Sequence, residues 1–67
     1  MHAGVIPPPV PVGKIKSFGP FGPKYEVGET IGGQLPNGDW LIEITMVETG
    51  EKAEYSYTHM ADDPEAS

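Results

Sequence analysis

The chain has 67 residues, a net charge of −6 and no cysteine, so we expect one small domain whose core is supported by no disulfide or thiolate metal site. It has no run of the roughly 18 apolar residues that a membrane-spanning helix needs, and its start lacks the pattern of a secretory signal. These properties argue against a multidomain enzyme and predict a soluble, cytoplasmic protein without a membrane partner.

The charge is unevenly distributed along the chain. Residues 1–25 contain three lysines and no acid, whereas residues 26–67 contain all ten acids and one lysine. Such an acidic body would repel nucleic-acid phosphates and anionic membrane surfaces. A basic patch on another protein is the better electrostatic match, although the acids also have a simpler explanation in keeping a small domain soluble.

Residues 1–12 are predicted to form a proline-rich flexible arm. Four of the five residues from Pro7 to Pro11 are proline, which fixes φ and favours an extended polyproline II conformation. Pro8 and Pro11 have the PxxP spacing that SH3-type grooves bind, but a proline-rich terminus often matches that spacing by chance. We therefore expect a disordered arm.

A weakly alternating segment and two aromatic triplets come next. Residues 12–18 suit a short edge strand, on which Lys14 and Lys16 would discourage pairing with other chains. The repeat FGPFGP has the three-residue period of polyproline II, which would place Phe18 and Phe21 on the same side. Such a pair either closes the end of a small sheet or forms an exposed hook for a partner.

The middle of the chain is predicted to contain two further strands. The first covers residues 24–27 and is expected to end at Gly28. The second, over residues 31–35, is weaker and bends at its glycines.

A tight turn follows at Asn37-Gly38. Asn-Gly between apolar runs predicts a type I′ turn, because both residues tolerate the positive φ that this turn requires. Leu35 would then face Trp40 across the turn.

The clearest pattern is a β-hairpin formed by residues 39–47 and 52–58. Apolar residues alternate along both segments, so one face is expected to enter the core: Trp40, Ile42, Ile44, Met46, Tyr55 and Tyr57. A loop of two or four residues places Ile44 opposite Tyr55 and keeps the apolar faces together, whereas a three-residue loop would separate them. An even-length loop is therefore predicted.

The end of the chain, residues 61–67, is predicted to be an acidic flexible tail that follows Met60, a candidate cap on the core. Asp63-Pro64-Glu65 is a favourable helix start, but too few residues follow it for more than one turn. Residues 13–60 are thus expected to form an all-β domain, a small antiparallel meander of three to four strands. An SH3-like half-open barrel is the commonest arrangement of such a chain.

Few residues are candidates for chemistry. His59 lies near Asp62 and Asp63, but no nucleophile occupies a recognisable motif, and a solvated histidine at a strand end is the simpler interpretation. One histidine and two adjacent aspartates do not make a closed metal site, and His2 belongs to the predicted arm. We therefore assign no catalytic, cofactor-binding or metal-binding residue and expect a protein that is not an enzyme.

Three aromatic residues in the basic segment, Phe18, Phe21 and Tyr25, are the candidate partner-binding residues. Together with an incomplete sheet, they favour a non-enzymatic protein-binding or adaptor module. A homodimer, in which two sheets join to complete one core, is the first alternative. The second is stacking of single-stranded nucleic acid on these rings, which the many acids disfavour.

The segments KSFGPFGPKYEVGE and LPNGDWLIEITMVETGEKAEYSYTHMADDPEA resemble a family of short bacterial proteins classed as a domain of unknown function. The resemblance covers approximately Lys14 to Ala66 and leaves the proline-rich arm outside. Its distinctive parts are GPFGPKYEVG, GDW, VETGE and DDPEA, none of which is a known catalytic or ligand motif. The resemblance implies a bacterial, non-secreted protein and implies no activity.

Overall fold

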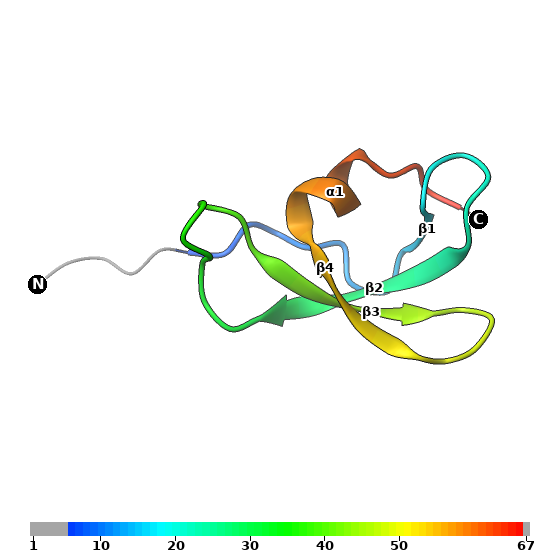
Figure 1. Cartoon of the computed structure of the whole chain (residues 1–67), viewed down its shortest axis with the longest axis horizontal. Coiled ribbons are helices and arrows are strands. Elements are labelled where there is room, and N and C mark those ends of the chain that lie inside the picture. The colour runs from blue at the N-terminus through cyan, green and yellow to red at the C-terminus, as the bar shows by residue number, and fades with distance from the viewer. Residues whose placement is uncertain (1–5, 67) are drawn as a thin grey trace, which may run out of the picture.

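The computed structural model describes residues 6–66 as one antiparallel sheet and a short helix. The elements are β1 (Ile15–Ser17), β2 (Lys24–Ile31), β3 (Leu41–Met46), β4 (Lys52–Ser56) and α1 (Tyr57–Asp62). The strand order β1-β2-β3-β4 pairs each strand with its neighbour in sequence (Figure 1). The predicted all-β meander is confirmed. Within residues 6–66, β1 and β4 are not paired with each other, so the sheet is open and does not close into a barrel.

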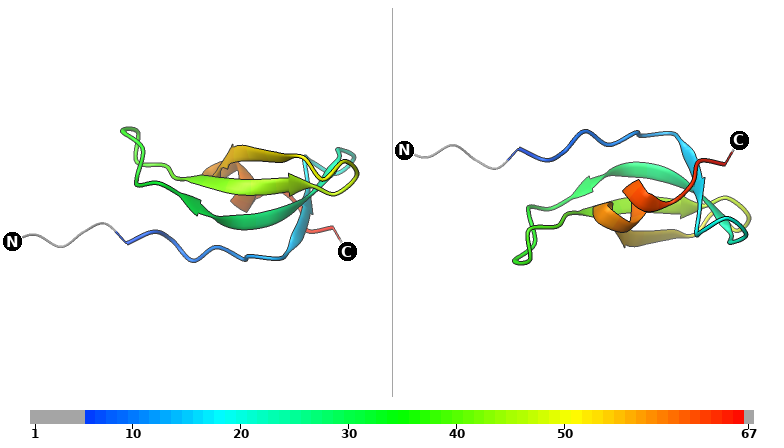
Figure 2. Two further views of the ribbon diagram at one scale, coloured as in Figure 1. Left: turned by 90° about the horizontal axis from the view of Figure 1, so that it is seen from below. Right: turned by 90° about the horizontal axis from the view of Figure 1, so that it is seen from above.

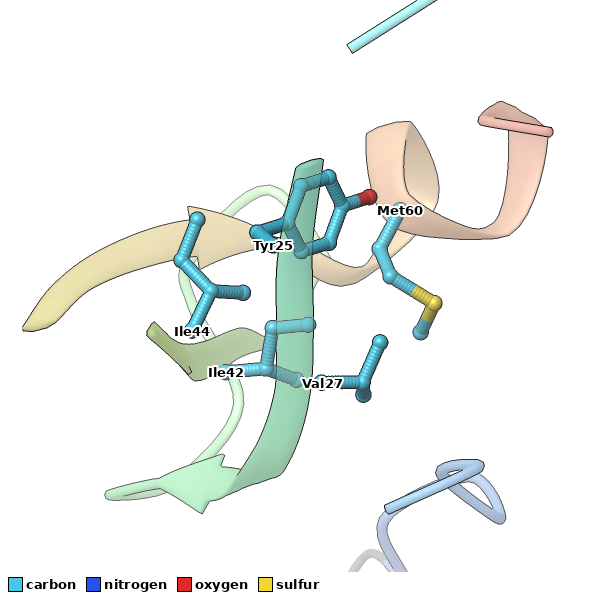
Figure 3. Close-up of a cluster of buried hydrophobic side chains, with 5 residues drawn as sticks. All are labelled: Tyr25, Val27, Ile42, Ile44 and Met60. Carbon is cyan, nitrogen blue, oxygen red and sulfur yellow. The ribbon is translucent and has the colours of Figure 1, made fainter. Parts of the chain in front are cut away.

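The core lies on one face of the sheet. Successive side chains of a strand alternate between faces, and β2 and β3 direct their apolar residues to the same one. The buried cluster consists of Tyr25, Val27, Ile42, Ile44 and Met60 (Figure 3). Around it pack the partly buried residues Val10, Phe18, Met46, Tyr55 and Tyr57. The predicted core face of the hairpin is confirmed, as is Met60 as its cap.

The β3–β4 hairpin keeps its apolar faces together, as predicted, but its register is shifted by two residues. The pairs are Leu41–Ser56, Ile42–Tyr55, Glu43–Glu54, Ile44–Ala53 and Thr45–Lys52. Ile44 therefore faces Ala53 rather than Tyr55, and the loop is formed by residues 47–50. Gly50 has a φ of 77°, which glycine adopts without strain. Because the last loop residue must take this conformation, the glycine determines the register.

The prediction that this strand ends at Gly28 is wrong, because β2 continues to Ile31 through a bulge. Its pairing with β3 shifts between Val27 and Thr30, as happens when one strand carries an extra residue. A Cβ at Gly28 would lie 2.6 Å from the main-chain oxygen of Glu43. Glycine is therefore used here for close approach of two strands, not to end one of them.

The turn at Asn37-Gly38 also differs from the prediction. Gly38 N donates to Leu35 O at 2.9 Å, and Leu35 N donates to Asp39 O at 2.8 Å. Of the two residues, Gly38 has a positive φ, of 89°, and Asn37 does not, so the predicted two-residue type I′ turn is wrong. Pro36 has the fixed φ that the first central position of a type I turn favours, and the glycine follows that turn. Leu35 consequently pairs with Asp39 and not with Trp40, the predicted partner.

The chain leaves β4 at Ser56 and enters α1, where a strand was predicted. The Ser56 hydroxyl accepts a hydrogen bond from His59 N at 3.1 Å and caps the helix N-terminus. Pro64 lies just beyond the helix, where proline commonly follows a C-cap. The predicted continuation of the strand to residue 58 is therefore wrong, and α1, with six residues, is longer than the single turn that was allowed.

Segments at both ends of the described chain lie against the sheet. Residues 64–66 run beside β1, and Ala66 N donates to Ile15 O at 2.8 Å. The proline-rich segment is extended along the sheet, and Val10 packs against the core (Figure 2). The flexibility of these segments and the domain boundaries after residues 12 and 60 stay predictions. His2 lies outside the described residues.

Candidate functional site

The loop between β1 and β2 contains the aromatic repeat. Phe18 N donates to Pro23 O at 3.1 Å and closes the loop. Gly19 has a φ of 74°, and a Cβ on Gly22 would overlap the main-chain oxygen of Phe18. The predicted polyproline II geometry is therefore wrong, because the glycines turn the chain back on itself.

This loop separates the predicted partner-binding residues. The ring centroid of Phe18 lies 4.7 Å from that of Tyr25 and 5.1 Å from that of Tyr55, so Phe18 packs on the core. Tyr25 is 0% exposed, whereas Phe21 is 98% exposed. Of the two alternatives for the aromatic pair, Phe18 therefore closes the sheet and Phe21 alone extends into solvent.

Phe21 has an exposed apolar neighbour at the same end of the sheet. In an antiparallel meander the β1–β2 and β3–β4 loops lie at one end. Val47 N donates to Lys24 O at 3.1 Å, and the Val47 side chain is 51% exposed. Its loop also carries the exposed Glu48, and the exposed Glu51 directly follows the loop. We call these four residues, Phe21, Val47, Glu48 and Glu51, the sheet-end surface.

A polar cluster joins α1 and the segment after it to the sheet. Asp63 Oδ2 accepts hydrogen bonds from the hydroxyls of Tyr25 at 2.7 Å and Tyr55 at 2.9 Å. Lys16 Nζ donates to Met60 O at 2.8 Å and to Asp63 O at 3.0 Å. These carbonyls lie at the C-terminal end of α1, where the positive charge of the lysine also interacts favourably with the helix dipole. Lys16 is only 7% exposed, so the prediction that it is a solvent-facing edge lysine is wrong.

Both tyrosines of the cluster are held as neutral phenols. The pKa of Tyr25 lies far above its ordinary value and the pKa of Tyr55 is raised to about 12, with burial as the largest cause of both shifts. The hydrogen bond to the Asp63 carboxylate and the negative charge of that group are smaller causes of the same two shifts. At neutral pH the phenols therefore act as hydrogen-bond donors, which suits a structural cluster better than proton abstraction.

Asp39 forms a second polar contact that the sequence did not indicate. Its carboxylate accepts hydrogen bonds from Trp40 N at 2.7 Å, from the Ser56 hydroxyl at 2.9 Å and from Thr58 N at 3.3 Å. The bond from Trp40 N is the main reason why the pKa of Asp39 is lowered. The ionised carboxylate thus fixes the exit from β4 into α1.

His59 is not joined to the neighbouring carboxylates by an ion pair among the residues that the structure describes. Its ring stacks on Tyr55 with a centroid separation of 5.9 Å, and the Asp63 carboxylate is occupied by the two tyrosines. Within residues 6–66, no group of three or more His, Cys, Asp or Glu side chains could hold a metal ion. The same part of the chain has no helix long and apolar enough to cross a membrane.

Comparison with known sequences places the chain in a family. The profile described as "Family of unknown function (DUF5397)" matches residues 4–67. The chain belongs to this family. The resemblance found in the sequence is thereby confirmed, and the match also includes the proline-rich segment, which that resemblance left outside. A protein of Haemophilus influenzae (strain Rd) named "Uncharacterized protein" is 49% identical to this DUF5397 chain over 57 residues, which are 85% of the chain and 89% of the relative.

The polar cluster of this DUF5397 protein was missed because its members are far apart in sequence. Tyr25 and Asp63 are separated by 38 residues, and Lys16 and Asp63 by 47. One local signal was present, since Pro64 directly after an aspartate marks the end of a helix as well as the start of one. Read as a helix end, it would have placed Asp63 at the C-terminus of a helix beside the core.

Proposed function

We propose that this protein is a non-enzymatic protein-binding module and that its sheet-end surface is the contact site. The observation that carries the proposal is the 98% exposure of Phe21, the most exposed of the large apolar side chains that the structure describes. Aromatic side chains are favoured at the centre of protein interfaces, because one ring buries a large area for the loss of few rotatable bonds. Phe21 therefore has the properties of an anchor residue.

The loop that carries Phe21 is shaped before any partner binds. The Ser17 hydroxyl donates to Gly19 O at 2.6 Å, and Phe18 N closes the loop on Pro23 O. Pro20 and Pro23 further restrict the main chain. A preformed loop reduces the conformational entropy lost on binding, and this favours recognition of a partner through a single exposed ring.

The chemistry of the surface indicates the kind of partner. Phe21 and Val47 would enter an apolar pocket, while Glu48 and Glu51 favour lysine or arginine at its rim. Residues 26–67, with ten acids and one lysine, add a negative electrostatic potential that also attracts a basic partner. Stacking of nucleic-acid bases receives less support, because Tyr25 is buried and Phe18 packs on the core.

Affinity capture from the bacterial host followed by calorimetry with the purified partner tests this proposal. We expect Phe21→Ala to weaken binding at least tenfold, about 1.4 kcal/mol, as is usual for an anchor residue. Val12→Ala is the matched control, since Val12 is also exposed, at 55%, but lies in the segment that precedes β1. Unchanged affinity of Phe21→Ala, with its thermal unfolding intact, would reject the sheet-end surface as the contact site.

A further inference from the structure

β4 is an edge of the sheet whose outer side carries unpaired main-chain groups. Tyr57 N donates to Trp40 O, and Met46 N donates to Glu51 O, which sets the alternation of hydrogen bonds along the hairpin. The main-chain groups of Ala53 and Tyr55 therefore point toward β3, and those of Lys52, Glu54 and Ser56 point outward. Within residues 6–66, no strand pairs with this outer side. It is open to β-strand addition.

The side chains along this edge carry an unbalanced charge. Glu43 and Glu54 lie opposite each other in a pair without hydrogen bonds between them, the type in which side chains approach most closely. Like charges in that position are destabilising. Lys52 is paired with Glu43 at 3.7 Å, and in the described part of the chain Glu54 makes no ion pair. A cation placed on the outer side of Glu54 would balance it.

We propose that the occupant of this edge is a second copy of the chain, paired antiparallel through β4 with Ala53 at the two-fold axis. In this register Lys52 lies directly opposite Glu54 of the partner subunit, and the symmetry repeats the pair. Lys52 and Glu54 both direct their main-chain groups outward, so each pair exchanges two main-chain hydrogen bonds. The added lysine lies on the side of Glu54 away from Glu43 and balances the repulsion between the two glutamates.

The choice of register follows from charge and size. Only residues that direct their main-chain groups outward can form hydrogen-bonded pairs between the two copies of β4. The possible registers of the two strands therefore differ from one another by steps of two residues. Centring the axis on Glu54 would place it opposite the partner's Glu54, which is unfavourable. Centring it on Ala53 brings two small side chains together in the closest type of pair. The edge is therefore self-complementary in one register.

Charge reversal tests this pairing in the full-length protein by sedimentation equilibrium. We expect the wild type to have twice the mass of the 7.2 kDa chain at high micromolar concentration. Glu54→Lys should weaken self-association at least tenfold, because it places Lys52 opposite a lysine, and the double variant K52E/E54K should restore it. Glu54→Lys also replaces the repulsive pair with Glu43 by an attractive one, so it should fold at least as stably as the wild type. A monomeric wild type, or a dimer that Glu54→Lys leaves intact, would overturn the proposal.

A cysteine scan tests the register itself. The chain contains no cysteine, so Ala53→Cys introduces a single thiol, at the position that would meet its own copy. Cα atoms in such a pair are about 4.5 Å apart, within the range of a disulfide. We expect Ala53→Cys to form a covalent dimer under mild oxidation and the control Glu54→Cys not to, since its two thiols would be offset along the strands. Cross-linking of Glu54→Cys in preference to Ala53→Cys would overturn the register.

Discussion

Replacement of Asp63 with alanine tests whether the polar cluster holds the C-terminal segment on the sheet. The variant removes the acceptor of two hydrogen bonds, from the hydroxyls of Tyr25 and Tyr55. Bonds to a charged group contribute about 1.5–3 kcal/mol each, and the partial burial of these two favours the lower value. We therefore expect the free energy of unfolding to fall by about 3 kcal/mol. Residue 63 has φ −73° and ψ 146°, which alanine adopts freely, so no main-chain strain is added.

A loss of this size is a large part of the stability of so small a domain, for which about 3–10 kcal/mol is typical. Urea unfolding followed by tryptophan fluorescence is the suitable assay, because Trp40 is the single tryptophan and is only 8% exposed in the folded state. Asp62→Ala, at an exposed neighbouring position, is the control and should change stability by less than about 0.5 kcal/mol.

A double-mutant cycle separates the hydrogen bond from other effects of the Asp63 substitution. Tyr25→Phe should cost about 1.5 kcal/mol in the wild type and close to nothing in Asp63→Ala, because its hydroxyl has already lost its acceptor. Additive losses in the cycle, or a loss below about 1 kcal/mol for Asp63→Ala alone, would refute the structural role assigned to the cluster.

Two further predictions concern β2 and the tyrosines. Gly28→Ala should destabilise the protein by about 1–3 kcal/mol in urea, because its Cβ would meet Glu43 O at 2.6 Å, whereas Gly33→Ala, with nothing within 4 Å, should not. Equal stability of the two variants would contradict the close approach. Burial raises the pKa of Tyr25 and Tyr55 in the folded state, so the unfolded chain releases these two protons at lower pH than the folded chain does. The stability that the two phenols contribute is therefore complete below the ordinary pKa of 10.0 and is lost as the pH rises above it. The urea concentration at the midpoint of unfolding should therefore decrease as the pH is raised from about 10 to 12, and it should decrease less steeply in Tyr55→Phe. A midpoint that does not change with pH in the wild type would contradict this prediction.

The alternation of apolar residues was enough to predict the sheet but not its register. Period-two patterning decides which face of β3 and β4 enters the core, and it does so equally well for registers that differ by two residues. The choice between them depends on Gly50, whose positive φ must fall at the last position of the loop. The same limit applies to Pro36, which selects the type of turn through one main-chain angle and leaves no trace in the hydrophobic pattern.

Long-range contacts explain the larger differences between prediction and structure. Lys16 has the sequence context of an exposed edge residue, and only the arrival of α1 above β1 gives its ammonium two carbonyl acceptors. Phe18 and Phe21 occupy equivalent places in a repeat, yet one packs on Tyr25 and Tyr55 and the other is exposed. Chemically equivalent residues were separated by the direction of the loop, which periodicity in the sequence does not encode.

The β4 edge and the anchor residue Phe21 lie on different parts of the protein, and this makes their two roles separable. The β4 edge runs along one side of the sheet, whereas Phe21 lies at its end. Because paired copies of β4 run antiparallel, the two Phe21 loops of a dimer would face opposite ends of the joined sheet, too far apart to meet in one small pocket. Each chain would then bind its own partner molecule, with one partner per chain and no contribution from dimerisation to the intrinsic affinity. The monomeric Glu54→Lys variant should therefore keep the partner affinity that Phe21→Ala loses, and Phe21→Ala should keep the dimer that Glu54→Lys loses.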